Sequence, residues 1–492
     1  MKKITKNFTV LFLLLAMLLP SAAMPGKGSA APVDPPVKVS SDVGTYIDGN
    51  AAYAGVQSNL EAMGVKQLAT EYEIFGLGQT IGLVDTGVDP LMPGFYNQNG
   101  SSKITDYFDA TTEGIAYIKG RYQAENGYIN VDGYNLNVSG LKTLGGIYLV
   151  GMLPSTISNQ FRVQRKLYFV VYDPMRAGVF EAVAIDTNSD LNFGDETVLY
   201  KFAVNKKTAL IKLNPNQSVS LVVSNIQENG EKITFGFDLH GHGTAMASIV
   251  TGFSKDVGGV APLAELVVAK VIGSTGQGSW SDIIRGVEYC LEKGAGVILI
   301  GAVPQTSITG TGWETLQKLA LSKGVHLVIP AGNSGPGVGT ITFSAYTNAL
   351  TSASGYYSAS TVQALLGKEI SSDLWYPYSS AGPGLEGGSG AHICAPALAP
   401  VPLSGSNGSL QFTLMDGTSV SAAYTAGAIA MLRQGAIRFG LEPFASASLA
   451  LTESAKKLQG VTPVEQGTGR INVLGAWSLL VQGINDPRLK LA

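Results

Sequence analysis

The chain has 492 residues, and its 33 Lys and Arg against 36 Asp and Glu give a formal net charge of −3 at pH 7. Charge this evenly balanced argues against a nucleic acid or an anionic membrane surface as partner. The 61 glycines favour a loop-rich α/β protein over a helical bundle. The two cysteines, Cys290 and Cys394, are too few for a disulfide framework, and we expect two buried thiols rather than a bridge.

The N-terminus has the pattern of an export signal. Residues 1–23 carry lysines at the start, an apolar run from Phe8 to Leu19 and then small residues. The run is short for a membrane span, so the pattern predicts a cleaved signal peptide and a secreted, extracellular protein without a membrane anchor. We expect residues 24–45 to form an extended lead-in and residues 485–492 a C-terminal tail.

From residue 46 onward, apolar strand patterns alternate with helical patterns, as a parallel sheet requires. In chain order the predicted elements are a strand at Thr80–Val84, a helix at Ala245–Gly252, a strand at Leu266–Ile272, a helix at Ser281–Lys293, a strand at Val297–Val303, a helix at Trp313–Lys323, a strand at Val325–Pro330 and a helix at Tyr424–Leu432. Residues 46–102 and 237–484 are therefore predicted to form one α/β domain with a mainly parallel sheet.

Residues 103–236 interrupt this alternation. Short β-rich segments such as Leu167–Tyr172 and Val219–Val223 are separated by turn residues, and helical periodicity is absent. We predict that this stretch is an antiparallel β-rich module inserted into the α/β domain.

Three short motifs supply the groups that acyl transfer by a serine requires. Ser419 follows a Gly-Thr turn at the mouth of an apolar helix, whose first N–H groups point back toward it. Asp85 ends an apolar strand, where a partly buried carboxylate can orient an imidazole; Asp89 is a weaker competitor. His242 lies in a Gly-His-Gly-Thr motif before a small-residue helix. The three predict a nucleophile, an orienting carboxylate and a general base.

Elimination among the four histidines favours His242 as the base. His326 lies inside an apolar strand and His392 lies in a loop, so we interpret both as structural. His240 is expected to contact solvent or substrate. Only His242 is followed by Gly-Thr and a helix that can hold its ring rigidly.

Asn333 is the candidate for a fourth role. It ends the turn Ala331–Asn333 at the carboxyl end of a strand, which is where parallel sheets place functional loops. Its amide can donate a hydrogen bond to an oxyanion, together with the backbone N–H of Ser419. The alternative interpretation of Asn333 is a turn asparagine without a catalytic role, and that of Asp85 is a turn aspartate.

Taken together, these motifs resemble the subtilisin-like serine proteases (peptidase family S8) in content and order. The matching segments are Gly82–Asp89, Gly241–Thr244, Gly259–Pro262, Ala331–Gly335 and Gly417–Ser419. The resemblance implies a three-layer α/β fold, an Asp85–His242–Ser419 triad and an oxyanion hole completed by Asn333. It also implies protein or peptide substrates, with no cofactor needed for catalysis.

The chain departs from the family pattern around the substrate cleft. Gly301, Ala302 and Val303 stand where a Ser-Leu-Gly strand usually lines the cleft, and Ala331 and Gly332 are expected to line it as well. Ala423 and Tyr424 follow the serine loop where proline and histidine are usual. The sequence therefore supports no prediction of cleavage specificity.

The long insertion is similar to that of the tripeptidyl-peptidase II-like members of the family. Such an exopeptidase needs an acidic clamp for the free amine of its substrate, and the insertion offers no identifiable one. A secreted serine endopeptidase is the more economical prediction. A tripeptidyl-peptidase-like exopeptidase and a non-catalytic binding protein on the same fold remain alternatives.

One loop in the insertion has oxygen side chains at alternating positions, as in loops that wrap Ca²⁺. The candidate ligands are Asp186, Asn188, Asp190 and Asn192. Leu191 replaces the usual sixth-position glycine and Thr197 the twelfth-position glutamate, so a polar hairpin loop is the alternative that the pattern favours.

Overall fold

The structure is a computed structural model that describes residues 34, 36–39, 46–161, 166–214, 217–227, 229–254, 257–308, 311–384, 387–388, 390–403 and 410–482. The expected signal peptide, most of the expected lead-in and the C-terminal tail lie outside these residues. In the described ranges, no helix is both long enough and apolar enough to cross a membrane.

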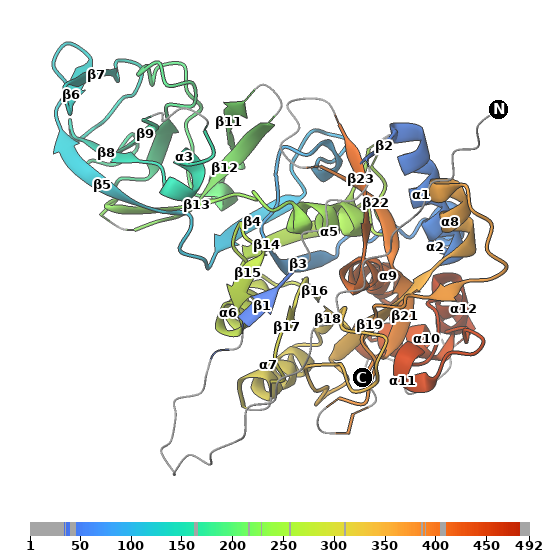
Figure 1. Ribbon diagram of the computed structural model, residues 1–492. Coiled ribbons are helices and arrows are strands. Elements are labelled where there is room, and N and C mark those ends of the chain that lie inside the picture. Colours follow the sequence, from blue (N-terminus) through green and yellow to red (C-terminus); the bar gives the residue numbers. More distant parts are fainter. Residues whose placement is uncertain are drawn as a thin grey trace, which may run out of the picture. The chain divides into compact units, whose positions relative to one another are not determined.

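A mainly parallel sheet forms the centre of the fold (Figure 1), as predicted. Its strands lie in the order β20, β19, β18, β16, β3, β14 and β4, and β21 pairs with β19. Every pairing is parallel except that of β20 with β19. The strands are β3 (Thr80–Asp85), β4 (Ile104–Asp109), β14 (Glu265–Lys270), β16 (Val297–Ile300), β18 (His326–Pro330), β19 (Leu350–Tyr357), β20 (Leu374–Trp375) and β21 (Ile393–Pro396).

Helices cover both faces of this sheet because its strands are apolar on both faces. On β14, Leu266 and Val268 pack into one core, and Val267 and Ala269 pack into the other. The first core contains helices α1 (Gly49–Ala62), α2 (Val65–Tyr72), α5 (His242–Thr251), α9 (Thr418–Arg438), α10 (Pro443–Glu453) and α12 (Val473–Gln482), and the second contains α6 (Trp280–Glu292) and α7 (Thr311–Ser322). The shorter helices are η1 (Pro93–Phe95), α3 (Ser155–Ser158), α4 (Phe202–Asn205), α8 (Ala359–Leu366) and α11 (Pro463–Gln466).

The inserted β module is also present, but it begins later than residue 103. Residues Ile104–Asp109 form β4, which pairs in parallel with β14 at the edge of the central sheet. The alternation of polar and apolar residues in β4 looks like that of the module, although β4 belongs to the α/β domain. The separate sheet begins at β5.

The module's strands pair antiparallel in the order β10, β9, β8, β5, β13, β12 and β11 (Figure 1). They are β5 (Ile115–Tyr122), β8 (Tyr148–Met152), β9 (Tyr168–Tyr172), β10 (Ala182–Ile185), β11 (Ala209–Asn214), β12 (Gln217–Ile226) and β13 (Lys232–Gly236). Strands β6 (Tyr128–Val131) and β7 (Tyr134–Asn137) form a separate hairpin.

Two small sheets complete the fold. In one, β1 (Pro36–Lys38) lies between β15 (Gln277–Ser279) and β17 (Val303–Pro304), antiparallel to both. In the other, β23 (Phe412–Asp416) lies between β2 (Tyr46–Ile47) and β22 (Leu398–Pro402). Strand β23 leads directly into α9, and therefore into Ser419.

Candidate active site

Asp85 ends the central strand β3, and its side chain is fully buried. The backbone N–H of Thr86 donates to its Oδ1 at 2.7 Å. Thr86 also ties this strand end to the start of α5, because its Oγ1 accepts the Gly243 N–H at 2.8 Å. The carboxylate and the helix that carries His242 are thereby held in a fixed relation.

His242 is the first residue of α5, and its ring is buried against Asp85. Its Nδ1 lies 2.8 Å from Oδ1 and 3.0 Å from Oδ2 of that carboxylate. Since an ionised carboxylate only accepts hydrogen bonds, the proton of neutral His242 lies on Nδ1, and Nε2 is left as an acceptor. Burial lowers the pKa of His242, but the charge and hydrogen bond of Asp85, with a contribution from Asp238, bring the net pKa above its ordinary value.

Asp238 holds the first turn of α5, a role that the sequence analysis missed. Its buried carboxylate accepts from the backbone N–H groups of His240, Gly241 and Thr244 at 3.1, 2.8 and 3.1 Å. It also accepts from the hydroxyls of Thr86 and Thr244 at 3.0 and 2.6 Å. Burial raises its pKa, against these hydrogen bonds. The available signal was an aspartate placed just before a helix start, where carboxylates cap free N–H groups.

Ser419 lies in the first turn of α9, which begins at Thr418 rather than at Tyr424 as predicted. Its backbone N–H is therefore among the first N–H groups of the helix, which have no acceptor within the helix. The Ser419 hydroxyl donates to the carbonyl of Gly301 at 3.1 Å. To reach Nε2 of His242, this hydroxyl has to turn away from Gly301.

Asn333 is oriented by Thr418, the residue before Ser419. Its Oδ1 accepts the Thr418 N–H at 3.0 Å and the Thr418 hydroxyl at 2.9 Å. A backbone N–H can only donate, so the amide oxygen has to face Thr418 and the NH₂ group has to face away. The amide donors of Asn333 are therefore left for another acceptor near the start of α9.

Gly301 connects the serine to the carboxylate. Its carbonyl accepts the Ser419 hydroxyl, and a Cβ added at Gly301 would lie 1.7 Å from Oδ2 of Asp85. That separation is far below contact distance, so the position admits no side chain while Asp85 keeps its place. The family usually has a serine at this position. Glycine here fits the close approach of the Asp85 carboxylate.

A cavity of about 350 Å³ adjoins Ser419 and Asn333. Gly301, Ala302 and Val303 line it as expected, and so does Gly332. Ala331 is not among its lining residues and is buried in the core instead. Lys38 and Val39 line the same cavity, so the N-terminal strand β1 reaches the site.

The remaining histidines do not contact Asp85. His326 is buried in β18, with Nδ1 3.2 Å from the Ser448 hydroxyl, and His392 accepts the Ser352 N–H at 3.0 Å. Burial lowers the pKa of both. Neither ring nitrogen of His240 has a hydrogen-bond partner among the described residues. Cys290 and Cys394 are buried free thiols, as expected.

The loop proposed for Ca²⁺ is held by hydrogen bonds to its own backbone. Asp186 accepts the N–H groups of Asp190 and Leu191 at 3.1 Å each, and Asp190 accepts that of Asn192 at 2.8 Å. Within the described part of the chain, no cluster of three His, Cys, Asp or Glu side chains is arranged to hold a metal ion. Calcium at Asp186, Asn188, Asp190 and Asn192 stays a prediction.

Comparison with known proteins gives the same family across most of the chain. The sequence pattern of the subtilase family, peptidase S8, matches residues 76–469. Pyrolysin of Pyrococcus furiosus is 27% identical over 522 residues, which cover 86% of this chain and 36% of pyrolysin. Tripeptidyl-peptidase 2 of Drosophila melanogaster is 32% identical over 266 residues, which cover 49% of this chain and 18% of that protein.

A shorter relative is also similar to this chain, and a solved structure has a similar fold. Subtilisin Savinase of Lederbergia lenta is 31% identical over 202 residues, which cover 40% of this chain and 64% of Savinase. The crystal structure of tripeptidyl peptidase 2 superposes with a TM-score of 0.66 at 21% identity, over 86% of this chain and 38% of that one. The matched region thus spans about a third of the length of pyrolysin and less than a fifth of that of the fly relative.

Proposed function

Because the chain belongs to the subtilase family of serine peptidases, we propose that it is an endopeptidase that cleaves polypeptides through an acyl-enzyme on Ser419. The observation that carries the catalytic assignment is the contact of His242 Nδ1 with Asp85 at 2.8 Å, next to a serine at a helix N-terminus. Proteins and peptides are then its substrates.

In the proposed reaction, Ser419 Oγ attacks the peptide carbonyl while His242 Nε2 takes the hydroxyl proton. Asp85 keeps His242 in the required tautomer and stabilises the imidazolium. The oxyanion accepts hydrogen bonds from the Asn333 amide and the Ser419 N–H. His242 then protonates the leaving amine, and water repeats the sequence to release the acyl group.

Strand β1 supports cleavage within a chain rather than removal of N-terminal tripeptides. It lies between β15 and β17 and leads toward Ser419, as a substrate strand would. Its first residue, Pro36, is preceded by further chain, so this cleft accepts a strand without a free amine at its start. A substrate has to displace β1 to take this place. A tripeptidyl-peptidase-like exopeptidase instead requires a group that binds a free amine.

The place where the protein acts is proposed from its N-terminal sequence. We propose that residues 1–23 direct the protein out of the cell, as their charged, apolar and small-residue segments indicate. Sequencing the N-terminus of the protein recovered from culture medium tests this, and retention of the intact chain inside the cells contradicts it.

Paired substrates test the proposed mode of cleavage. Internally quenched peptides of about ten residues are prepared with a free or an acetylated N-terminus, and Ser419→Ala serves as the inactive control. We expect similar kcat/KM values for the two forms and no turnover by the variant. Turnover restricted to the free-amine form, with tripeptides released, contradicts the endopeptidase. Equal turnover by Ser419→Ala contradicts the catalytic assignment.

A further inference from the structure

A tight turn at Gly273–Gln277 lies beside strand β1, which lines the cavity at Ser419. It joins β14 to β15 and is closed by hydrogen bonds from Gly273 N–H to the Gln277 carbonyl at 2.8 Å and from Gly276 N–H to the Gly273 carbonyl at 2.9 Å. The carbonyl of Gly276 accepts the Val39 N–H at 3.0 Å. The turn therefore contacts the chain directly after β1, and it leads into β15, with which β1 pairs.

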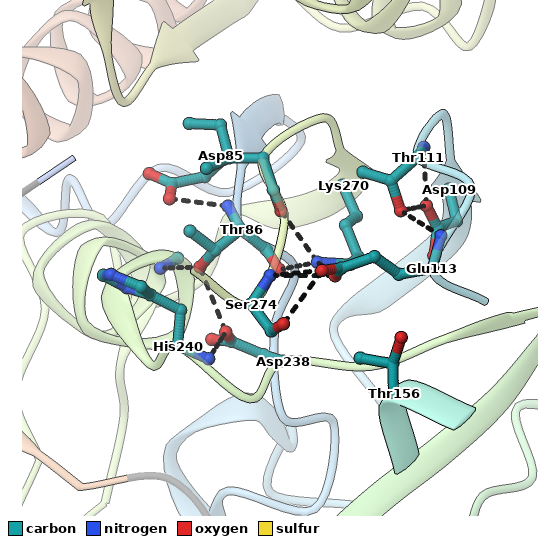
Figure 2. A network of polar contacts seen from close by, with 12 residues as sticks. Asp85, Thr86, Asp109, Thr111, Glu113, Thr156, Asp238, His240, Lys270 and Ser274 are labelled. Carbon is teal, nitrogen blue, oxygen red and sulfur yellow. Dashed lines mark hydrogen bonds and ion pairs between the residues drawn. The ribbon is translucent and has the colours of Figure 1, made fainter. Parts of the chain in front are cut away.

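Glu113, which lies outside this turn, accepts hydrogen bonds from Ser274 in the turn. It lies in the junction between β4 of the central sheet and β5 of the inserted module. Its two carboxylate oxygens accept the Ser274 N–H at 3.0 and 2.8 Å, and one of them accepts the Ser274 hydroxyl at 2.8 Å. Figure 2 shows the carboxylate of Glu113 between Ser274 and Lys270.

Lys270 links this clamp to the triad. Its ammonium group is fully buried, lies 3.4 Å from Glu113 and donates to the carbonyls of Thr86 and Ile272 at 3.0 and 2.7 Å. Thr86 follows Asp85 directly. One buried cation thus contacts both the strand end that carries the catalytic carboxylate and the glutamate that holds the Gly273–Gln277 turn (Figure 2).

We propose that Glu113 is a positioning residue, which fixes the Gly273–Gln277 turn at the distance from Ser419 that a bound strand requires. This rests on the proposed function only in that the bound strand is a substrate. The inserted module is then joined to the substrate cleft through its first connection, and the charge of Lys270 offsets the cost of partly burying the Glu113 carboxylate, whose side chain is 22% exposed.

Amide exchange in β1 reports on the position of the Gly273–Gln277 turn, because β1 lies beside this turn and lines the cavity at Ser419. Hydrogen exchange with mass spectrometry on the full chain follows the amides of residues 37–39. Charge-assisted hydrogen bonds are the strong ones, and Glu113→Ala removes every one that holds Ser274. We expect these amides to exchange about tenfold faster in Glu113→Ala, with a smaller increase in Glu113→Gln. Exchange in β3 and α5 stays unchanged.

Glu231→Ala is the matched control. Glu231 also belongs to the module, and its pair with Arg121 at 2.9 Å is about half exposed, so its loss has little effect on stability. Should Glu113→Ala fail to fold, Ser274→Ala removes one of the same hydrogen bonds, and a rise of about threefold is expected. Unchanged exchange at residues 37–39 overturns the proposal, and so does equal acceleration in β3 and α5, which indicates general destabilisation.

A second readout separates this proposal from the proposed function. Hydrolysis of p-nitrophenyl acetate needs the nucleophile but no extended strand, so we expect Glu113→Ala to lower its rate by a smaller factor than it lowers kcat/KM for an extended quenched peptide. An equal fall in both overturns a positioning role. If the wild-type protein hydrolyses no ester, the proposed function fails, whereas the exchange result still decides the role of Glu113.

Discussion

Replacing Asn333 by alanine separates transition-state stabilisation from substrate binding. The variant loses the amide donors that point away from Thr418, whereas the contact between Asp85 and His242 and the Ser419 N–H are left intact. Losing one oxyanion donor of this kind raises the barrier by about 2.7–4 kcal/mol, a value known from a subtilisin. We therefore expect kcat to fall roughly 10² to 10³-fold, with KM nearly unchanged.

The structure also gives the cost of this change to stability. Asn333 is exposed, and its oxygen accepts two hydrogen bonds from Thr418 that alanine cannot replace. Each is worth about 1 kcal/mol, so we expect a loss of about 1–2 kcal/mol in the free energy of unfolding. A loss of this size leaves most molecules folded, so it cannot explain the expected fall in kcat.

Steady-state kinetics on a quenched peptide and thermal denaturation measure the two effects. Val338→Ala is the matched control, because Val338 lies in the same loop and its side chain is 68% exposed. A fall in kcat of less than tenfold, or a change confined to KM, refutes the placement of Asn333 in the oxyanion hole.

The remaining predictions concern geometry, pH and the N-terminal strand. Gly301→Ala places a Cβ 1.7 Å from Oδ2 of Asp85, so the carboxylate has to move. Its displacement should lower kcat/KM by roughly 10²-fold. Activity near that of wild type contradicts this close approach. The pKa of His242 is raised and only its neutral form accepts a proton, so kcat/KM should rise with pH with a midpoint above about 6.5, and a lower midpoint contradicts the assignment. Burial raises the pKa of Asp109 to about 7, so its stabilisation is full below about pH 3.9 and is lost by about pH 7. In thermal denaturation Asp109→Asn should therefore gain on wild type between about pH 4 and 7, and a difference that stays constant over this range refutes the reasoning. Val37→Asp puts a charge on a fully buried position of β1 and should lower KM for peptides several-fold by freeing the cleft, whereas an unchanged KM shows that β1 does not compete.

Local patterns were enough to find the groups that lie at element ends. Asp85 follows an apolar strand, and His242 and Ser419 lie at the starts of helices, so each position could be predicted from short-range sequence. The orientation of Asn333 could not, because it depends on a hydrogen bond from Thr418, which is far away in the chain. The predicted start of α9 at Tyr424 is too late because Thr418 and Ser421 are polar and look like loop residues, yet both are buried in the folded protein.

Long-range pairing explains the other differences. The residues of β4 alternate in polarity like those of the inserted module, and only their pairing with β14 assigns them to the central sheet. Strand β1 lies in a stretch expected to be an extended lead-in, and its sequence gives no sign of the partners β15 and β17. Glu113 and Ser274 are likewise distant in sequence, so their contact follows from the fold alone.

Covalent labelling of Ser419 tests the central claim most directly. The full-length protein is treated with a fluorophosphonate probe, digested and analysed by mass spectrometry, with Ser419→Ala and His242→Ala treated in parallel. We expect one labelled peptide, which contains Ser419, with labelling absent in Ser419→Ala and strongly reduced in His242→Ala. Folded wild-type protein that takes up no probe, or takes it up equally in all three proteins, contradicts the account.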